Sequence, residues 1–320
     1  MPVFQSASHY CVIECTGNDS VDFLQRMTTG NITSLKSGEY LRTALVTEKG
    51  RLVDVLTVLR NDTRNWLLLC TASQAEAIYR WFRKYIIMDD VQLRFAQEYH
   101  SVELWFIGDS VLNGHRFLPS SNHVLEFELA TYKSIAAIVS QSPDHWDVPC
   151  IVVTVLSNLT KEKHDDFTRA IAAPSLDDEQ RHCLRVHAGI GCAPNEYNDR
   201  YTPNDAGLNA YLHLGKGCFI GQEVIERLTV QQKSRWKLYS ISTDQAGYDE
   251  LRSTPELFTN SDRDPVGHVT SVAPPCTMFV PSWLDYRGLA YVASSIGTPE
   301  QLHTQNGVPV YLRCAIRYEQ

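Results

Sequence analysis

The most informative segment of the chain reads Leu214-Gly215-Lys216-Gly217-Cys218-Phe219-Ile220-Gly221-Gln222-Glu223-Val224-Ile225. Gly217 and Gly221 flank Cys218, and because glycine permits backbone shapes that other residues avoid, they predict a sharp turn that leaves the thiol uncovered. A helix is expected to begin near Gln222, and its positive end, together with the Lys216 ammonium, favours the thiolate. A thiolate is both a nucleophile and a soft-metal ligand, so Cys218 is the candidate catalytic residue, supported by Lys216. The alternative is a buried cysteine that fills a tight turn.

The bulk composition is that of an ordinary globular protein. The 320 residues are enough for more than one packed domain, and 43% hydrophobic with 21% charged residues excludes wholesale disorder. A formal net charge of −8 argues against a nucleic-acid partner, which needs a basic surface. No apolar run is long enough to span a bilayer, so no membrane partner is expected either.

The N-terminus and the cysteines bear on location. Residues 1–15 have neither the basic and apolar regions of a signal peptide nor the Arg-rich character of a transit peptide. The nine cysteines are irregularly spaced and include no Cys-x-x-Cys, which predicts neither a disulfide framework nor a zinc ribbon. We expect most of them to be buried in a reducing compartment. A cytoplasmic, bacterial protein is the expectation, with the mitochondrial matrix as the alternative if a transit peptide has been removed.

The first two thirds of the chain alternate strands with helices. Residues 10–15, 40–47 and 52–59 have β-rich patterns, and the last two are joined as a hairpin around 48–50. Residues 73–86 begin with a capping-box pattern and carry apolar residues at helical spacing, which predicts the clearest helix of the chain. Hairpins mixed with helices indicate an α+β fold.

The pattern changes after residue 232. Short β-rich runs at 236–242, 266–272, 289–293 and 308–316 are separated by Gly, Pro, Asn and Asp. Such a pattern is typical of a small β-barrel or sandwich. We therefore predict two domains, an α+β body over 1–232 and a C-terminal β-barrel over 233–320.

Common catalytic motifs are absent from the sequence. Neither a Rossmann glycine motif nor a phosphate-binding loop is present, because Gly215-Lys216-Gly217-Cys218 lacks the spaced glycine and the Ser or Thr after the lysine. The zinc-protease and serine-hydrolase motifs are missing as well. Dinucleotide binding and nucleotide hydrolysis are therefore not predicted.

The run from Lys216 to Glu223 resembles the K-G-C-[FY]-x-G-Q-E signature of the YgfZ family, which includes the mitochondrial iron–sulfur assembly factor of eukaryotes. The lead-in at 201–208 matches too, and weaker resemblance covers 22–29, 50–54 and 267–271. The resemblance implies an aminomethyltransferase-like folate-binding fold, with a body of two intertwined subdomains and a C-terminal β-barrel. It also implies a central cleft of drug-sized volume, with Cys218 near its rim.

The function implied by this resemblance is assistance in the assembly or repair of iron–sulfur clusters, linked to tetrahydrofolate or a derivative. Cys218 would act as nucleophile or as a transient metal ligand for an iron–sulfur cluster. The expected partners are iron–sulfur assembly proteins of the A-type carrier class and client enzymes. The expected folate-binding residues are Asp54, His187, Gly217, Gly221, Gln222 and Glu223.

Two alternatives come from the same superfamily. The folate-dependent aminomethyltransferase of glycine cleavage has two consecutive aspartates after its hairpin glycine, and the second works at the folate; here Val55 follows Asp54. Its folate-binding glutamate lies in an L-E-A-G-like run, where this chain has His187, and a neutral imidazole cannot pair with the pterin as a carboxylate does. We therefore expect no aminomethyl transfer, and either weak folate binding or a rotated pterin. The third possibility is a folate-binding module without thiol chemistry, in which Asp54 is an ordinary polar residue of the hairpin.

Three smaller groups are weaker candidates. They are His9 with Cys11 and Cys15 as a metal site, His182 with His187, and the basic cluster of Lys233, Arg235 and Lys237. A core strand and ordinary histidines are the preferred interpretations of the first two. The basic cluster is interpreted as a solvated face that would also suit an acidic partner or a polyglutamate tail.

Overall fold

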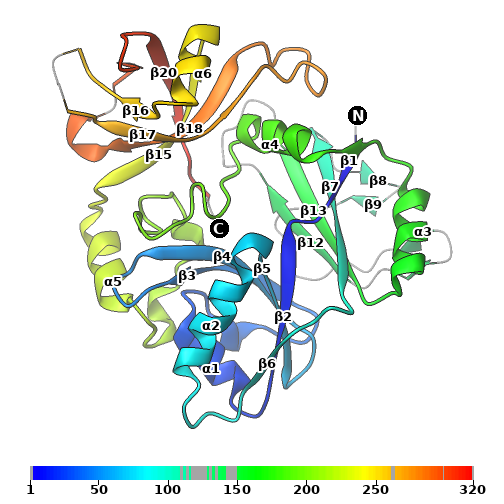
Figure 1. Cartoon of the computed structure of the whole chain (residues 1–320). Coiled ribbons are helices and arrows are strands. Elements are labelled where there is room, and N and C mark those ends of the chain that lie inside the picture. The colour runs from blue at the N-terminus through cyan, green and yellow to red at the C-terminus, as the bar shows by residue number, and fades with distance from the viewer. Residues whose placement is uncertain are drawn as a thin grey trace.

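The computed structural model describes residues 3–108, 150–260, 264–297 and 299–318, and between 109 and 149 only the backbone of short strands. Three sheets surround the centre of the molecule, and the C-terminal end of the chain lies between them (Figure 1). None of the helices in the described ranges is both long and apolar enough to cross a membrane.

The first sheet is antiparallel and has the strand order β3-β4-β5-β2-β6. Its strands are β2 (Tyr10–Thr16), β3 (Tyr40–Val46), β4 (Leu52–Arg60), β5 (Asn65–Thr71) and β6 (Gln92–Phe95). Helices α1 (Ser20–Met27) and α2 (Ala75–Tyr85) bury Phe23, Leu24, Ile78 and Phe82 against it in one core cluster. The predicted hairpin and helix are confirmed. The predicted capping box is wrong, because α2 begins at Ala75 after a turn of 3-10 helix and has no side-chain cap.

The second sheet has the order β12-β13-β7-β1-β14. Its strands are β1 (Val3–Ala7), β7 (His100–Ile107), β12 (Ala136–Gln141), β13 (Cys150–Ser157) and β14 (Ser175–Leu176). Every residue of β13 is buried, because α3 (Lys161–Ile171) contributes to the core on one face and α4 (Asp178–His187) to the core on the other. Helix α4 begins with a capping box between Asp177 and Gln180 that satisfies its first N–H groups.

The third sheet has the order β16-β17-β18-β15-β20-β19. Its strands are β15 (Trp236–Thr243), β16 (Glu256–Leu257), β17 (Gly267–Ala273), β18 (Tyr286–Ala293), β19 (Gln301–His303) and β20 (Pro309–Ala315). An isolated bridge between Phe258 and His303 connects its two edges, so the sheet is a nearly closed barrel with α6 (Gln245–Leu251) beside it (Figure 1). The predicted C-terminal β-barrel is confirmed as a fold. We retain the division at 232/233 as a proposal.

Candidate functional site

Cys218 lies on a loop between the 3-10 turn η4 (Leu214–Lys216) and helix α5 (Gln222–Gln231). All nine cysteines fall within the described residues, and among them Cys218 is the exposed one. Gly217 has a φ of 98°, and a Cβ built there would meet no atom within 4 Å. The predicted uncovered turn is confirmed, whereas the chemistry of the thiol stays a prediction.

Helix α1 holds this loop from one side. The Gln25 side-chain amide donates to the Lys216 carbonyl at 2.9 Å, and the Ile220 N–H donates to the Arg26 carbonyl at 3.0 Å. These bonds connect residues 22–29 with the 216–223 motif. Both stretches carry the family resemblance, and they lie almost two hundred residues apart in sequence.

The β3–β4 turn holds the loop from the other side. A Cβ on Gly50, which has a φ of 67°, would lie 3.1 Å from the Val224 side chain in α5. The Gln222 side-chain oxygen accepts from the Phe219 N–H at 3.2 Å and closes the turn. The exposed Glu223 carboxylate lies in the first turn of α5, where the helix dipole favours it.

Lys216 is oriented toward helix α1. Its ammonium donates to the Gln25 carbonyl and lies 5.1 Å from the centre of the Phe219 ring. Burial lowers the pKa of Lys216 to about 7. The charge that was expected to favour the Cys218 thiolate therefore disappears just above neutral pH.

A second group of polar residues lines a cavity where the first and second sheets meet α4. It is lined by His9, Tyr10, Arg42, Asp54, Val55, Thr71, Glu103, Trp105, Val152, Arg181, Arg185, Ile190, Gly191, Cys192 and Tyr197. The cavity volume is about 30 Å³, enough for one or two waters, so this cavity is far smaller than the predicted drug-sized cleft. Cys218 is not among the lining residues.

Ion pairs fill this cavity. The buried Glu103 carboxylate accepts from Arg181 Nε at 2.9 Å and from the Trp105 indole at 3.2 Å, and His9 Nδ1 lies 2.6 Å from it. Burial alone would raise the pKa of Glu103, but His9 and Arg181 lower it to about 2. His9 therefore belongs to this network, and not to a metal site with Cys11 and Cys15.

Asp54 is enclosed in the wall of the cavity. Its carboxylate accepts from the N–H groups of Thr71 and Val55, both at 2.8 Å, and from the Thr71 hydroxyl at 3.1 Å. Burial raises the pKa of Asp54 despite these bonds. A carboxylate with these partners is held as a structural acceptor.

His187 lies in neither place. It ends α4, is buried, stacks on Trp283 at 5.0 Å between ring centres, and places Nε2 2.8 Å from the Pro274 carbonyl. Desolvation lowers its pKa to about 4. The expected folate-binding residues are thus divided: Asp54 is in the cavity, His187 is at the C-terminal barrel, and the other four shape the Cys218 loop.

A buried ion pair that sequence reasoning missed joins the body to the third sheet. Arg185 in α4 lies 3.0 Å from Glu196, whose other oxygen accepts from the hydroxyls of Thr270 and Ser271 at 2.7 and 2.6 Å. This explains the resemblance at 267–271 as a structural joint. No local pattern marks Arg185, whereas Glu103 could have been noticed as a lone acid inside an apolar strand.

Cys11 differs from the buried cysteines, because its pKa is lowered. The hydrogen bond with the neighbouring Cys70 thiol lowers the pKa of the half-buried Cys11 to about 7, although burial alone would raise it. The two residues are paired directly across β2 and β5. Cys11 is therefore the natural comparison for Cys218.

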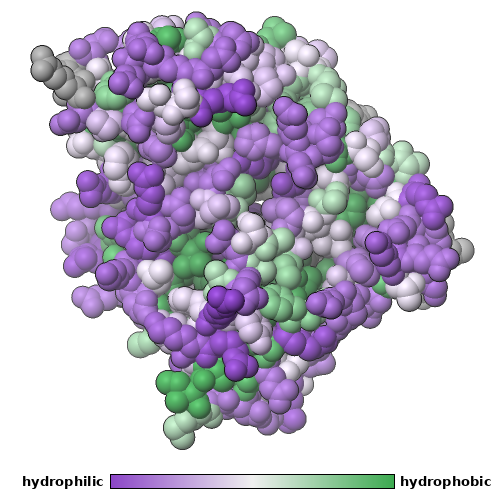
Figure 2. Space-filling view, viewed as in Figure 1, coloured by the Kyte–Doolittle hydropathy of each residue, from purple (hydrophilic) through white to green (hydrophobic). Residues whose placement is uncertain are grey.

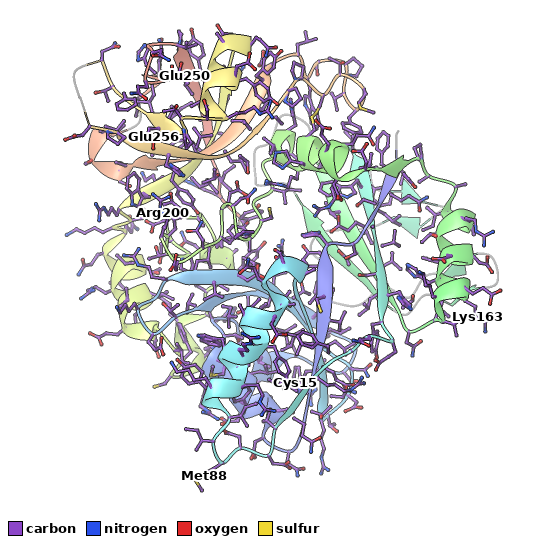
Figure 3. All side chains as sticks on the ribbon, viewed as in Figure 1. Cys15, Met88, Lys163, Arg200, Glu250 and Glu256 are labelled. Carbon is purple, nitrogen blue, oxygen red and sulfur yellow. A yellow bond between two sulfur atoms is a disulfide. The ribbon has the colours of Figure 1, made fainter. Side chains whose placement is uncertain are left out.

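An apolar tip lies near the Cys218 loop. Ile87 and Met88 are 84% and 94% exposed in the turn after α2. Figure 3 shows Met88 at the lower end of the molecule, where Figure 2 shows exposed hydrophobic residues. The next residue, Asp89, lies 2.5 Å from the guanidinium of Arg26, and the backbone carbonyl of Arg26 accepts from the Ile220 N–H.

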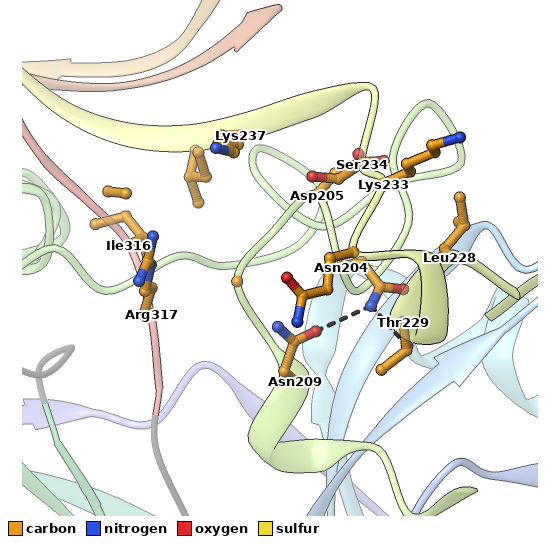
Figure 4. A pocket seen from close by; sticks show the side chains of 14 residues that line it. Asn204, Asp205, Asn209, Leu228, Thr229, Lys233, Ser234, Lys237, Ile316 and Arg317 are labelled. Carbon is orange, nitrogen blue, oxygen red and sulfur yellow. Dashed lines mark hydrogen bonds between the residues drawn. The ribbon is translucent and has the colours of Figure 1, made fainter. Parts of the chain in front are cut away.

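The basic cluster faces two pockets. Lys233 and Lys237 line one of about 470 Å³ together with Arg317, beside the hydrogen-bonded Asn204 (Figure 4). Arg235 lines a second pocket, to which Lys233 also contributes. Neither of the two pockets is lined by all three cations of the predicted cluster.

Comparisons with known proteins agree with this architecture. A family model described as the GCVT N-terminal domain matches residues 4–105. An aminomethyltransferase of Bacillus cereus (strain G9842) is 34% identical over 278 residues, which cover 82% of this chain and 72% of that protein. The aminomethyltransferase of Bacillus cytotoxicus is 25% identical over 281 residues, with the same shares covered.

A solved structure shows the same fold. The glycine cleavage system aminomethyltransferase T from Bartonella henselae aligns with a TM-score of 0.72 at 16% identity, over 100% of this chain and 88% of that one. The α+β body with its C-terminal barrel is thus an aminomethyltransferase-like, folate-binding fold. The chain belongs to the aminomethyltransferase family that the GCVT domain defines.

Proposed function

We propose that this protein is a YgfZ-type factor that assists the assembly or repair of iron–sulfur clusters, with Cys218 as its reacting thiol. The observation that carries the proposal is the presentation of Cys218, exposed on a loop fixed by α1 and by the β3–β4 turn. A thiol held on a rigid loop is suited to ligand exchange with a cluster delivered by another protein.

The arrangement around Asp54 supports the thiol over a carboxylate. Val55 occupies the position at which the aminomethyltransferase is expected to place its working acid, and Asp54 itself is buried behind three hydrogen bonds. Neither residue offers a carboxylate that is free to move a proton at a substrate.

An exposed surface linked to the Cys218 loop through Arg26 supports a protein partner. Ile87 and Met88 form an exposed apolar tip, and Asp89 and Arg26 connect it to the Cys218 loop. Exposed apolar side chains rimmed by charge are typical of transient protein interfaces. We propose that a carrier of the A type docks here and that Cys218 becomes a transient ligand of its cluster, which is cargo.

The residues that line the central cavity have suitable chemistry for tetrahydrofolate, but the cavity is too small for it. The aromatic rings of Tyr10, Trp105 and Tyr197 with nearby carboxylates are suitable lining groups, but a space of about 30 Å³ does not admit a pterin. Binding would require Arg181 to leave Glu103. We therefore propose weak folate binding, and the chemistry proposed for Cys218 does not involve folate.

The comparisons favour a second candidate, a folate-dependent aminomethyl or one-carbon transferase. The relatives described above are named aminomethyltransferases, and one of them is 34% identical to this chain. By similarity alone this candidate has the more direct support. A third, a folate-binding module without thiol chemistry, would predict that Cys218 is dispensable.

Two assays on the same set of variants separate the candidates. The first measures the activity of a [4Fe–4S] enzyme in cells that lack their own family member. These cells express wild type, Cys218→Ser or the control Cys314→Ser. The second measures aminomethyl transfer from loaded carrier protein to tetrahydrofolate. We expect rescue by wild type and Cys314→Ser, loss with Cys218→Ser, and no transfer by any variant. Robust transfer that survives Cys218→Ser would establish the transferase, and rescue by Cys218→Ser would leave the thiol without a role.

A further inference from the structure

Two cysteines and a histidine meet at the joint between α4 and the C-terminal barrel. Cys183 and His187 lie one helical turn apart on α4, and Cys276 lies in the loop after β17. One ligand atom from each lies within 4.8 Å of the others, and the residues are only 8%, 3% and 2% exposed. Ninety-three positions separate the two cysteines in sequence, so no motif marks the group.

The structure shows a disulfide between Cys183 and Cys276, the oxidised form of this group. His187 is oriented beside it. Its Nε2 lies 2.8 Å from the Pro274 carbonyl, which can only accept, so Nε2 carries the proton and Nδ1 carries the lone pair. A histidine that donates one ring N–H to a backbone carbonyl is the usual arrangement of a metal ligand.

The surroundings make this group a structural joint. Cys183 and Cys276 belong to one apolar cluster that contains Trp105 from β7 and Trp283 from the loop that leads to β18. The group therefore connects the second sheet, α4 and the barrel, and whatever joins the two sulfur atoms fixes the barrel on the body.

We propose that, when both cysteines are thiols, Cys183, His187 and Cys276 bind one Zn²⁺ ion. Two thiolates and a neutral imidazole are preferred zinc ligands, and they leave one tetrahedral position for a water or a backbone oxygen. Zn²⁺ balances the two thiolate charges, and a buried site favours a neutral total.

Zinc binding and the disulfide exclude each other. Binding releases the two thiol protons to solvent and forms two Zn–S bonds. In the oxidised form the two thiols have instead lost two electrons and two protons to a disulfide oxidant, such as oxidised glutathione, which is reduced to two thiols. The contact between α4 and the barrel thus has two alternative cross-links, a disulfide and a zinc ion.

The test titrates Zn²⁺ into reduced, chelator-treated protein that carries Cys218→Ser, so that the exposed thiol contributes nothing, in competition with a chromophoric zinc chelator. We expect one equivalent to bind, with at least 100-fold weaker affinity in Cys276→Ser and in His187→Gln. The glutamine keeps an N–H donor for the Pro274 carbonyl, and circular dichroism verifies the fold. Cys314→Ser is the matched control and should bind as tightly as its parent.

The oxidised arm uses protein treated with oxidised glutathione, in which the disulfide is verified by intact mass after alkylation. It should bind no zinc at this site. Three results would overturn the proposal: no zinc taken up by the reduced protein, equal binding by folded Cys276→Ser or His187→Gln, or equal binding by the oxidised protein.

Discussion

Gly221 packs backbone to backbone against Gly50. A Cβ built on Gly221 would lie 3.1 Å from the Cα of Gly50 and 2.6 Å from the Thr47 carbonyl oxygen, so only a glycine fits. The turn of the first hairpin and the loop of the reacting thiol are therefore one structural unit. Cys218 can be held rigidly while remaining exposed, because its fixation comes from the glycines and from the Gln25 amide.

The first prediction concerns this contact. Gly221→Ala should lower the free energy of unfolding by about 2–3 kcal/mol, because the residue has a φ of 77° and the methyl group would meet backbone. Gly215→Ala is the control, since a Cβ there has no atom within 4 Å. Urea titrations of both variants measure the difference. Equal stabilities would show that the two glycines are not in close contact.

The second prediction is a pH dependence caused by Lys216. Its pKa is lowered to about 7 in the folded chain, so between pH 7 and its unfolded value the unfolded state binds more protons, and stability rises with pH. Relative to Lys216→Met, wild type should gain about 1–2 kcal/mol from pH 7 to pH 9, a figure discounted for partial exposure. Unfolding curves of both proteins at several pH values give the result. A constant difference would mean that Lys216 titrates normally.

The third prediction concerns the joint between body and barrel. The side chains of Arg185 and Glu196 are 3% and 0% exposed, so removing one charge leaves the other buried without its partner. Arg185→Met and Glu196→Gln should each cost about 3–5 kcal/mol, and the double variant less than their sum. A double-mutant cycle from chemical denaturation measures the coupling. Additive costs would contradict the pairing.

Much of the fold could be predicted from sequence, because its signals are local. The hairpin at 40–60, the helix of 73–86 and the C-terminal barrel follow from periodicity and turn residues. The family motif was sufficient for the fold class and for an exposed Cys218. The motif was not sufficient to predict where the Lys216 ammonium points, because that direction depends on where α1 ends.

The cavity and the cysteine joint could not be predicted, since each depends on contacts between distant segments. Glu103 meets Arg181 and His9 only after β7, α4 and the connection between β1 and β2 have packed together. Cys183 meets Cys276 only when the barrel docks on α4. Position 187 illustrates the same limit: alignment with a folate-binding glutamate implied a cavity residue, whereas the helix ends with this side chain against Trp283.

The fourth prediction concerns folate. Binding must open a cavity of about 30 Å³ and break the Arg181–Glu103 pair, and breaking a buried ion pair costs several kcal/mol. Calorimetry should therefore give a dissociation constant for tetrahydrofolate above about 1 µM, which corresponds to about −8 kcal/mol. Submicromolar affinity would show that the cavity opens at little cost.

The central claim is that Cys218 meets the cluster of a partner, and cysteine alkylation under partner protection tests it most directly. Brief treatment with iodoacetamide followed by peptide mapping gives a labelling rate for each cysteine, with the half-buried Cys11 as internal comparison. We predict that Cys218 labels fastest in the protein alone, and at least tenfold more slowly when a cluster-loaded A-type carrier is present. The apo carrier should have little effect, and Cys11 should label at the same rate throughout. Cys218 labelling that is unchanged by the loaded carrier would contradict the proposed function.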